Sequence, residues 1–228
     1  MISNKIDQGL KGSPKIPGDK SISHRSVIIP SIANGKTEVK NILKSEDVVH
    51  TINAFKNMGV EIIENNENMI INGKGLNSLK EPKSEIYLGN SGTSARLLTG
   101  LLSTQKFNSS ITGDKSLSSR PMMRIVNPLS AMDAKIQTTN GSLPIKINGQ
   151  NLKSKDIEIK IPSAQIKSGI ILAALNTDGK TRIIENSVTR DHTEIMLESF
   201  GADINTYLEN NKKIIEINGK KEFNSNKI

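Results

Sequence analysis

Residues 17–25, Pro17-Gly18-Asp19-Lys20-Ser21-Ile22-Ser23-His24-Arg25, combine a turn signal with groups that bind anions. Proline, glycine and aspartate favour a turn, and the apolar residues that follow predict a helix near residues 23–33. Lys20 and Ser21 are therefore expected at or just before a helix N-terminus, where free N–H groups and the helix dipole favour an anion. The Arg25 guanidinium adds a planar fork that suits phosphate or carboxylate. An ordinary capped helix with solvated charges explains this stretch equally well on its own.

Two later stretches, residues 89–96 and 162–168, also precede apolar helical patterns and are rich in small polar residues. In the first, Asn90 and Gly92 belong to a run that lets the backbone approach a ligand and turn its N–H groups inward. A plain tight turn is the alternative. In the second, Ser163-Ala164-Gln165 taken alone fits a helix N-cap. The chain contains an internal triplication, marked by the tripeptide Ile-Asn-Gly at residues 71–73, 147–149 and 217–219. The anion-binding interpretation gains weight because all three stretches occupy the same place in their copies.

Residues 113–122 form another basic stretch that nearly copies residues 18–25 in composition, at a different phase of the repeat. Arg120 precedes Pro121, so we expect it to be extended, and Pro121 is suited to the first position of the next helix. A solvated arginine is the alternative. Arg190 occupies the corresponding region of the third copy of the repeat.

Two other kinds of site are not supported by the sequence. Asp47 and His50 are separated from Asp191 and His192 by most of the chain, and a histidine near a helix start is more often a capping or packing residue than a metal ligand. Residues 18–21 lack the Gly-Lys-Ser/Thr order of a P-loop.

Composition favours small anionic ligands. The 228 residues include 31 Lys and Arg against 23 Asp and Glu, a formal net charge of +8, which suits anionic partners. Aromatic residues make up only 3%, which disfavours stacking on nucleic-acid bases, and cysteine is absent, which excludes disulfides and thiolate chemistry. Since no run reaches membrane-spanning length and no signal-like apolar segment follows the N-terminus, we expect a cytoplasmic protein without membrane or nucleic-acid partners.

Two markers support the internal triplication. The tripeptide Ile-Asn-Gly recurs at residues 71–73, 147–149 and 217–219, with spacings of 76 and 70 residues. A second marker, a helix end that runs into a strand, recurs at Met58, Met132 and Phe200, with spacings of 74 and 68 residues. Agreement between markers indicates a repeated structural unit.

Each copy predicts an apolar helix, a strand, an amphipathic helix and two strands. In the first copy, the strand is expected near 36–42, the second helix near 47–58, and the last strands near 60–64 and 68–71. Helices that are apolar nearly all round belong in the interior. The fold class is therefore α/β, with three buried parallel helices surrounded by sheets and outer helices. The domain is expected to span residues 15–220, with repeats at about 15–75, 84–150 and 155–219, and with stubs at 1–14 and 221–228.

Five motifs, in order, resemble those of the EPSP synthase family. They are residues 17–25, 89–96, 118–122, 163–168 and 189–194, and the likeness covers residues 8–219. The Ser-Ala-Gln form is similar to the bacterial class whose members often tolerate glyphosate. The related UDP-N-acetylglucosamine enolpyruvyl transferases share the fold, but their usual loop cysteine is missing here.

The resemblance implies two similar domains, each of three βαβαββ units, with the active site between them. This chain then corresponds to the N-terminal domain and lacks the C-terminal half. The implied reaction transfers the enolpyruvyl group of phosphoenolpyruvate to the 5-hydroxyl of shikimate 3-phosphate, with no metal or other cofactor, in an enzyme that is a monomer when complete. Because the general acid and base are implied in the missing half, which could be supplied in cis or in trans, we expect this chain to be inactive alone.

Residue roles also come from the resemblance. Lys20 is the implied catalytic residue, between the two substrates. The residues implied to hold shikimate 3-phosphate are Lys20, Ser21, Arg25, Ser163, Ala164, Gln165 and Arg190. Those implied to face phosphoenolpyruvate are Lys20, Asn90, Gly92, Arg120 and Gln165.

Two alternatives from other classes remain open. One is a stand-alone module that captures a phosphorylated ligand without turning it over, and the other is a nucleic-acid-binding protein that uses the +8 charge. Polyanion binding weakens steeply with salt, whereas a pocket for one phosphorylated acid selects its stereochemistry.

Overall fold

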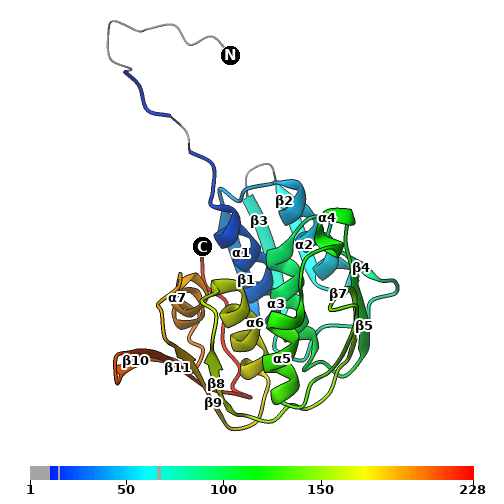
Figure 1. Ribbon diagram of the computed structural model, residues 1–228. Coiled ribbons are helices and arrows are strands. Elements are labelled where there is room, and N and C mark those ends of the chain that lie inside the picture. Colours follow the sequence, from blue (N-terminus) through cyan, green and yellow to red (C-terminus); the bar gives the residue numbers. More distant parts are fainter. Residues whose placement is uncertain (1–10, 15, 66–67) are drawn as a thin grey trace, which may run out of the picture.

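Three helices lie side by side in the interior: α1 (Lys20–Ile32), α3 (Gly92–Leu102) and α6 (Ala164–Leu175) (Figure 1). The computed structural model describes residues 11–14, 16–65 and 68–228. Every residue of α1 from Ser23 to its end is buried, as is every residue of α6 from Ile166 to its end. This agrees with the prediction that helices apolar nearly all round form the core.

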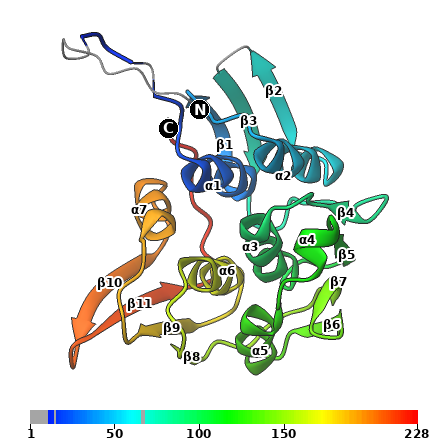
Figure 2. The ribbon, with the colours of Figure 1, turned by 45° about the horizontal axis from the view of Figure 1, so that its top comes forward.

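The strands of the described residues form three sheets around these helices, one from each copy of the repeat (Figure 2). The first sheet, in the order β1-β3-β2, contains β1 (Asn34–Lys40), β2 (Glu61–Asn65) and β3 (Asn68–Lys74). The second, in the order β4-β5-β7-β6, contains β4 (Ile86–Tyr87), β5 (Asn108–Thr112), β6 (Lys135–Thr139) and β7 (Ser142–Asn148). The third, in the order β10-β11-β9-β8, contains β8 (Asp156–Ile159), β9 (Lys180–Glu185), β10 (Ile204–Glu209) and β11 (Lys212–Asn218).

Each copy also contributes an outer helix. These are α2 (Glu46–Asn57), α5 (Met123–Ala131) and α7 (His192–Ser199), and a short helix α4 (Lys115–Ser118) precedes α5. Helices α2 and α7 pack on α1, whereas α5 packs on α3 and α6. The α/β fold class with inner and outer helices is thus confirmed. The first helix begins at Lys20 rather than near Ser23, because Asp19 Oδ1 accepts a hydrogen bond from the Ile22 N–H at 2.8 Å and caps the extra turn.

The last residues of the chain lie along the free edge of β1. The Asn34 N–H donates to the Phe223 carbonyl at 2.8 Å, and the Lys40 N–H donates to the Ile228 carbonyl at 3.1 Å. The pairing is parallel, as are the pairs β4–β5 and β8–β9 in the other two sheets. Residues 221–228, expected outside the triplicated unit, therefore occupy in the first sheet the place that β4 and β8 hold in the others. Residues 1–10 of the first expected stub lie outside the described residues.

The repeated Ile-Asn-Gly tripeptide has a packing explanation. Each of its glycines packs against backbone carbonyl groups in the last turn of an inner helix or in the residues just after it. A Cβ atom built on Gly73, Gly149 or Gly219 would lie 2.1, 2.1 or 1.8 Å from the oxygen of Pro30, Gln105 or Thr177, respectively. Since no side chain fits at such distances, the same residue recurs in every copy.

Candidate functional site

The N-terminal ends of the three inner helices converge on one cavity of about 560 Å³. Its lining comes from the first turns of α1 and α3, the start of α2, one residue of α6 and Arg120. The lining residues are Lys20, Ser21, Ser45, Glu46, Asp47, Asn90, Gly92, Thr93, Arg120 and Gln165. The predicted convergence of the helix starts is therefore present, and four of the lining side chains are charged.

Each inner helix begins with a side-chain cap. Asp19 caps α1, Ser91 caps α3 by accepting from the Ser94 N–H at 3.1 Å, and Ser163 caps α6 by accepting from the Ile166 N–H at 3.4 Å. These caps satisfy the third N–H of each helix, and the helix dipoles add partial positive charge on the side of the cavity.

The turn before α3 differs from the expected anion-binding nest. The Ser91 N–H donates to the Leu88 carbonyl and the Gly92 N–H donates to the Asn90 carbonyl, both at 3.0 Å. The turn thus closes on itself, as in the alternative of a plain tight turn. Gly92 has a different importance, because a Cβ atom there would lie 2.7 Å from Arg96 Nη1 and 2.8 Å from Arg120 Nη1. Its missing side chain leaves room for two guanidinium groups.

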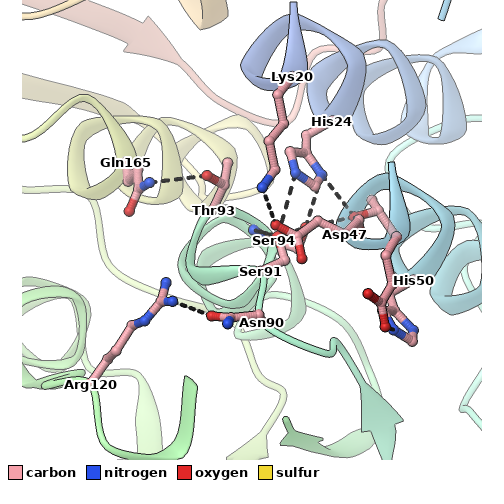
Figure 3. A network of polar contacts seen from close by, with 12 residues as sticks. Lys20, His24, Asp47, His50, Asn90, Ser91, Thr93, Ser94, Arg120 and Gln165 are labelled. Atoms are coloured by element: carbon pink, nitrogen blue, oxygen red, sulfur yellow. Dashed lines mark hydrogen bonds and ion pairs between the residues drawn. The ribbon is translucent and has the colours of Figure 1, made fainter. Parts of the chain in front are cut away.

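Lys20 reaches across the cavity entrance and forms an ion pair with Asp47 (Figure 3). The Lys20 side chain is 52% exposed, whereas that of Asp47 is 13% exposed. Sequence reasoning missed Asp47 as a cavity residue, because an acid in the first turn of a helix is also what the helix dipole favours. Lys20 is consequently not an isolated cation but half of a pair at the mouth of the cavity.

Arg120 donates from Nη2 to Asn90 Oδ1 (Figure 3). It follows α4, whose cap is Asp114, with Oδ1 accepting from the Leu117 N–H at 2.7 Å. The likeness of residues 113–120 to residues 18–25 is therefore structural, since both begin with an aspartate that caps a helix. The prediction that Pro121 opens the next helix is wrong, because α5 begins at Met123 with Met122 as its N-cap.

A second cavity of about 10 Å³ adjoins the first and is lined by two more arginines. It is lined by Ser21, Arg25, Thr93, Ala164, Gln165, Arg190 and His192. Three of these residues, Ser21, Thr93 and Gln165, also line the first cavity, so the two cavities share a wall.

Arg25 is almost completely buried beside this second cavity, at 3% exposure. Its guanidinium donates to Thr193 Oγ1 at 2.6 Å, to Ser168 Oγ at 2.7 Å and to the Ser21 carbonyl at 2.8 Å. Burial lowers its pKa to about 10, and the Glu194 carboxylate opposes that shift. Arg25 therefore keeps its charge at neutral pH in a position fixed by three helices.

The Gln165 side chain is held at both ends of its amide. Its Nε2 donates to Thr93 Oγ1 and its Oε1 accepts from Arg96 Nη1, each at 3.0 Å. Helices α3 and α6 approach closely enough for this because Gly100 faces Gly169, where a Cβ atom would lie 1.9 Å from a carbonyl oxygen. Burial, followed by the charges of nearby arginines, lowers the pKa of Arg96.

A buried histidine joins the starts of α1, α2 and α3 beneath the first cavity. His24 Nδ1 lies 2.9 Å from Thr51 Oγ1 and 3.0 Å from Ser94 Oγ, while Nε2 lies 3.4 Å from Ser91 Oγ (Figure 3). Burial lowers the pKa of His24 to about 4. The ring is therefore neutral at physiological pH and acts as a hydrogen-bonding joint between the helices.

Most of the sequence-predicted residues meet at these two cavities. Ser163 is the exception among them within the described residues, since it lines neither cavity and caps α6. Five residues line a cavity without having been assigned to the site: Ser45, Glu46, Asp47, Thr93 and His192. Thr93 follows Gly92 in a motif that sequence reasoning had already singled out, so its position was the available signal.

Outside these two cavities, the described residues contain neither a metal-binding cluster nor a pocket that includes a predicted site residue. Their His, Asp and Glu side chains include no group of three that could hold a metal ion. A groove of about 540 Å³ between α5 and β8 is lined largely by isoleucine, proline and alanine, and it contains none of the predicted site residues. None of the helices among the described residues combines the length and the apolar character that a membrane span requires.

Comparisons with known proteins agree on one family. The family model described as EPSP synthase (3-phosphoshikimate 1-carboxyvinyltransferase) matches residues 5–228. A curated 3-phosphoshikimate 1-carboxyvinyltransferase from Ruthia magnifica is 49% identical over 216 residues, which are 94% of this chain and 49% of that protein. One from Lactococcus lactis subsp. lactis is 50% identical over 200 residues, covering 86% of this chain and 46% of that protein.

A solved structure of EPSP synthase from Acinetobacter baumannii has the same fold. It aligns with a TM-score of 0.89 at 48% sequence identity, covering 95% of this chain and 49% of that chain. The present chain thus spans about half the length of the relatives that it matches.

Proposed function

Because the chain belongs to the EPSP synthase family, we propose that it forms the half of a 3-phosphoshikimate 1-carboxyvinyltransferase that binds shikimate 3-phosphate and one side of phosphoenolpyruvate. On this proposal residues 15–220 form the N-terminal domain, residues 221–228 pair with the edge of its first sheet, and residues 1–14 belong with the second domain. The observation that carries the proposal is the meeting of Lys20, Arg25, Arg120 and Arg190 at two adjoining cavities.

The groups around the smaller cavity suit the anionic groups of the phosphorylated hydroxy acid, and because its volume is only about 10 Å³, the rest of the ligand lies in the adjoining larger cavity. Arg25 and Arg190 supply two permanent positive charges, and the amide of Gln165 and the hydroxyl of Ser21 supply neutral hydrogen bonds. The helix start at Ala164 brings backbone N–H groups to the same place.

The larger cavity suits phosphoenolpyruvate. In Figure 3, Lys20 lies at the top and Arg120 at the lower left, and Asn90 and Gln165 line the same cavity. Lys20 lies where it can contact both ligands, since its neighbour Ser21 lines both cavities. In the proposed reaction, the 5-hydroxyl of shikimate 3-phosphate gives its proton to a base and its oxygen bonds to carbon 2 of phosphoenolpyruvate, while carbon 3 takes a proton from an acid. Phosphate then leaves the tetrahedral intermediate with the C–O electron pair, and loss of a proton restores the enol double bond.

Among the described residues, the larger cavity offers cations and hydrogen bonds for that reaction but no suitable acid–base pair. The carboxylates that line the larger cavity are Glu46, which is 90% exposed, and Asp47, which is ion-paired with Lys20. Addition to the enol needs a proton donor to carbon and a base within hydrogen-bond reach of the hydroxyl. We therefore assign both groups to the other half of the enzyme.

Isothermal titration calorimetry with shikimate 3-phosphate tests the ligand assignment. Arg190→Ala is expected to weaken binding about tenfold or more, because a charged hydrogen bond contributes roughly 1.5–3 kcal/mol. Arg182→Ala is the matched control, since Arg182 pairs with Asp156 and Glu209 on the third sheet and lines neither cavity. Equal affinities for all three proteins, or equal affinity for shikimate without its phosphate, would overturn the assignment.

Phosphate release tests the division of labour. The purified chain mixed with both substrates is expected to release no phosphate above background, and addition of a matching second half is expected to restore release. Release by the chain alone would place the acid and base in this half. Binding without release even with the second half present would favour a stand-alone binding module.

A further inference from the structure

A cluster of three buried charges lies behind the smaller cavity. The Lys167 side chain is 0% exposed, and its Nζ lies 2.9 Å from Glu185 Oε2 and 2.7 Å from Glu194 Oε1. The two carboxylate side chains are 1% and 6% exposed. None of the three residues lines either cavity, so direct contact with a ligand does not explain why the fold buries them.

The cluster holds the start of the loop that carries Arg190. Glu185 Oε1 accepts a hydrogen bond from Thr189 Oγ1 at 2.6 Å, and Lys167 Nζ donates to the Thr189 carbonyl at 3.4 Å. Glu194 belongs to the first turn of α7, just after the loop. Residues 190–192, which include two cavity residues, are therefore fixed on both sides by contacts to one lysine.

The neighbouring residues of the same helices hold Arg25. Ser168 follows Lys167 on α6, Thr193 precedes Glu194 on α7, and their hydroxyl oxygens lie 2.7 Å apart. Both hydroxyls also accept from the Arg25 guanidinium. If the spacing between α6 and α7 changed near Lys167, both Arg25 and Arg190 would therefore move.

Stability alone is a poor explanation for such a cluster. Burying charges is costly, and apolar residues of similar volume often stabilise a fold as well or better. What apolar residues could not supply is the pair of directional hydrogen bonds to Thr189.

We infer that Lys167, together with Glu185 and Glu194, is a positioning residue that holds Arg190 and Arg25 at the spacing required by the phosphorylated ligand. This inference rests on the proposed function for the identity of that ligand. The cluster acts through Thr189 and the start of α7, and it sets the geometry of the cavity before the ligand arrives.

The test uses Thr189, because removal of Lys167 would take the nearest cation from two buried carboxylates, leaving Lys213 Nζ at 3.7 Å from Glu194 Oε1, and could unfold the chain. Thr189→Val keeps the volume and loses the hydroxyl, whereas Thr189→Ser keeps the hydroxyl and loses a methyl group. Affinity for shikimate 3-phosphate is measured by calorimetry for both variants. Valine is expected to weaken binding about fivefold and serine less than twofold, while Ser187→Ala, an exposed hydroxyl on the same loop, serves as a control without effect.

A double-mutant cycle distinguishes positioning from a general structural effect. If Thr189 acts through Arg190, Thr189→Val in an Arg190→Ala background should weaken binding no further than Arg190→Ala alone. A fivefold loss in both backgrounds, or a serine variant as weak as valine, would overturn the inference.

Amide hydrogen exchange of the ligand-free chain separates this inference from the proposed function. Thr189→Val is expected to speed exchange in residues 187–192, and Thr189→Ser is expected to match the wild type. Unchanged exchange in the valine variant would overturn the positioning role whatever the ligand. A wild-type chain that fails to bind shikimate 3-phosphate would instead overturn the proposed function, and the exchange data would still decide whether the cluster holds the loop.

Discussion

The two ends of the inner helices obey different rules. At their C-terminal ends, α1, α3 and α6 all meet the same Ile-Asn-Gly tripeptide. A Cβ atom added to its glycine would lie 2.1 Å or less from a backbone carbonyl oxygen at or just beyond the helix end. At their N-terminal ends they begin with three different sequences, and these open on the two cavities. The repeated tripeptide therefore reflects the same packing requirement in every copy. The helix starts differ in sequence because the three copies contribute different groups to one asymmetric site.

The largest expected effect is at the repeated end. Gly219→Ala would place a Cβ 1.8 Å from the Thr177 oxygen and 2.4 Å from the Ala174 oxygen, both backbone atoms that cannot move aside alone. We expect the free energy of unfolding to fall by about 3 kcal/mol or more, as measured by urea denaturation. Any folded fraction should still bind shikimate 3-phosphate with wild-type affinity.

Gly201→Ala is the control for this change. A Cβ there meets no atom within 4 Å, but the residue has a φ of +75°, so it should cost only about 1–2 kcal/mol from backbone strain. If Gly219→Ala is no more destabilising than Gly201→Ala, the tripeptide is not repeated because of packing.

Much of the fold could be predicted because its signals are local and repeated. The helix-start residues at 20–25, the markers at Met58 and Phe200, and the Ile-Asn-Gly ends each report a constraint within one copy. The pairing of residues 223–228 with β1 could not be predicted in this way, because it joins the last segment of the chain to the first copy. Only the spatial closure of the three copies around the inner helices brings those strands together.

The candidate site was predictable for residues on the inner helices and less so elsewhere. Lys20, Arg25 and Gln165 stand at helix starts, where their chemistry and position agree. Asp47 and the Lys167 cluster depend on how the outer helices α2 and α7 pack on α1 and α6, and a single sequence carries no direct signal of that packing. The turn at Gly92 was misinterpreted because a nest and a self-closed turn use the same residues.

The second largest expected effect concerns His24, which links α1, α2 and α3 near the N-terminal ends of the inner helices. The pKa of His24 is lowered from 6.5 to about 4, with burial as the main cause, Lys20 and Arg25 acting in the same direction and Asp47 opposing. Between these two pH values the unfolded chain binds more protons than the folded chain. The contribution of neutral His24 to the free energy of unfolding is therefore present in full above pH 6.5 and declines as the pH falls toward 4. The decline attributable to His24 is roughly 3 kcal/mol.

Urea denaturation of the wild type and His24→Asn across that pH range measures this term. The variant should be less stable near pH 7, because it loses part of the hydrogen-bonded joint, and the difference between the two proteins should shrink toward pH 4. Parallel curves would show that His24 is not neutral in the folded protein.

A smaller loss of stability is expected for the glycine at the N-terminal ends of the inner helices, Gly92, than for Gly219 at the C-terminal ends. In Gly92→Ala the new Cβ would crowd only the ends of the Arg96 and Arg120 side chains, which are flexible, so the free energy of unfolding should change by less than about 1 kcal/mol. Displacement of the two guanidinium groups should nevertheless weaken phosphoenolpyruvate binding about threefold to tenfold. Titration in the presence of shikimate 3-phosphate would show this, and unchanged affinity would make Gly92 only a turn residue.

The smallest expected effect concerns the ion pair at the cavity mouth. Because the Lys20 side chain is 52% exposed, its pair with Asp47 should contribute less than about 1 kcal/mol to stability. An anion that binds Lys20 must compete with the Asp47 carboxylate and also feel its repulsion. Asp47→Asn removes both effects while it keeps the shape of the side chain, so affinity for inorganic phosphate at low salt should rise about threefold. Since screening weakens interactions between exposed charges, the gain should shrink at high salt. A fall in affinity would show instead that Asp47 holds Lys20 in its binding position, and the charges at this end of the helices would then form a preset arrangement rather than a competing pair.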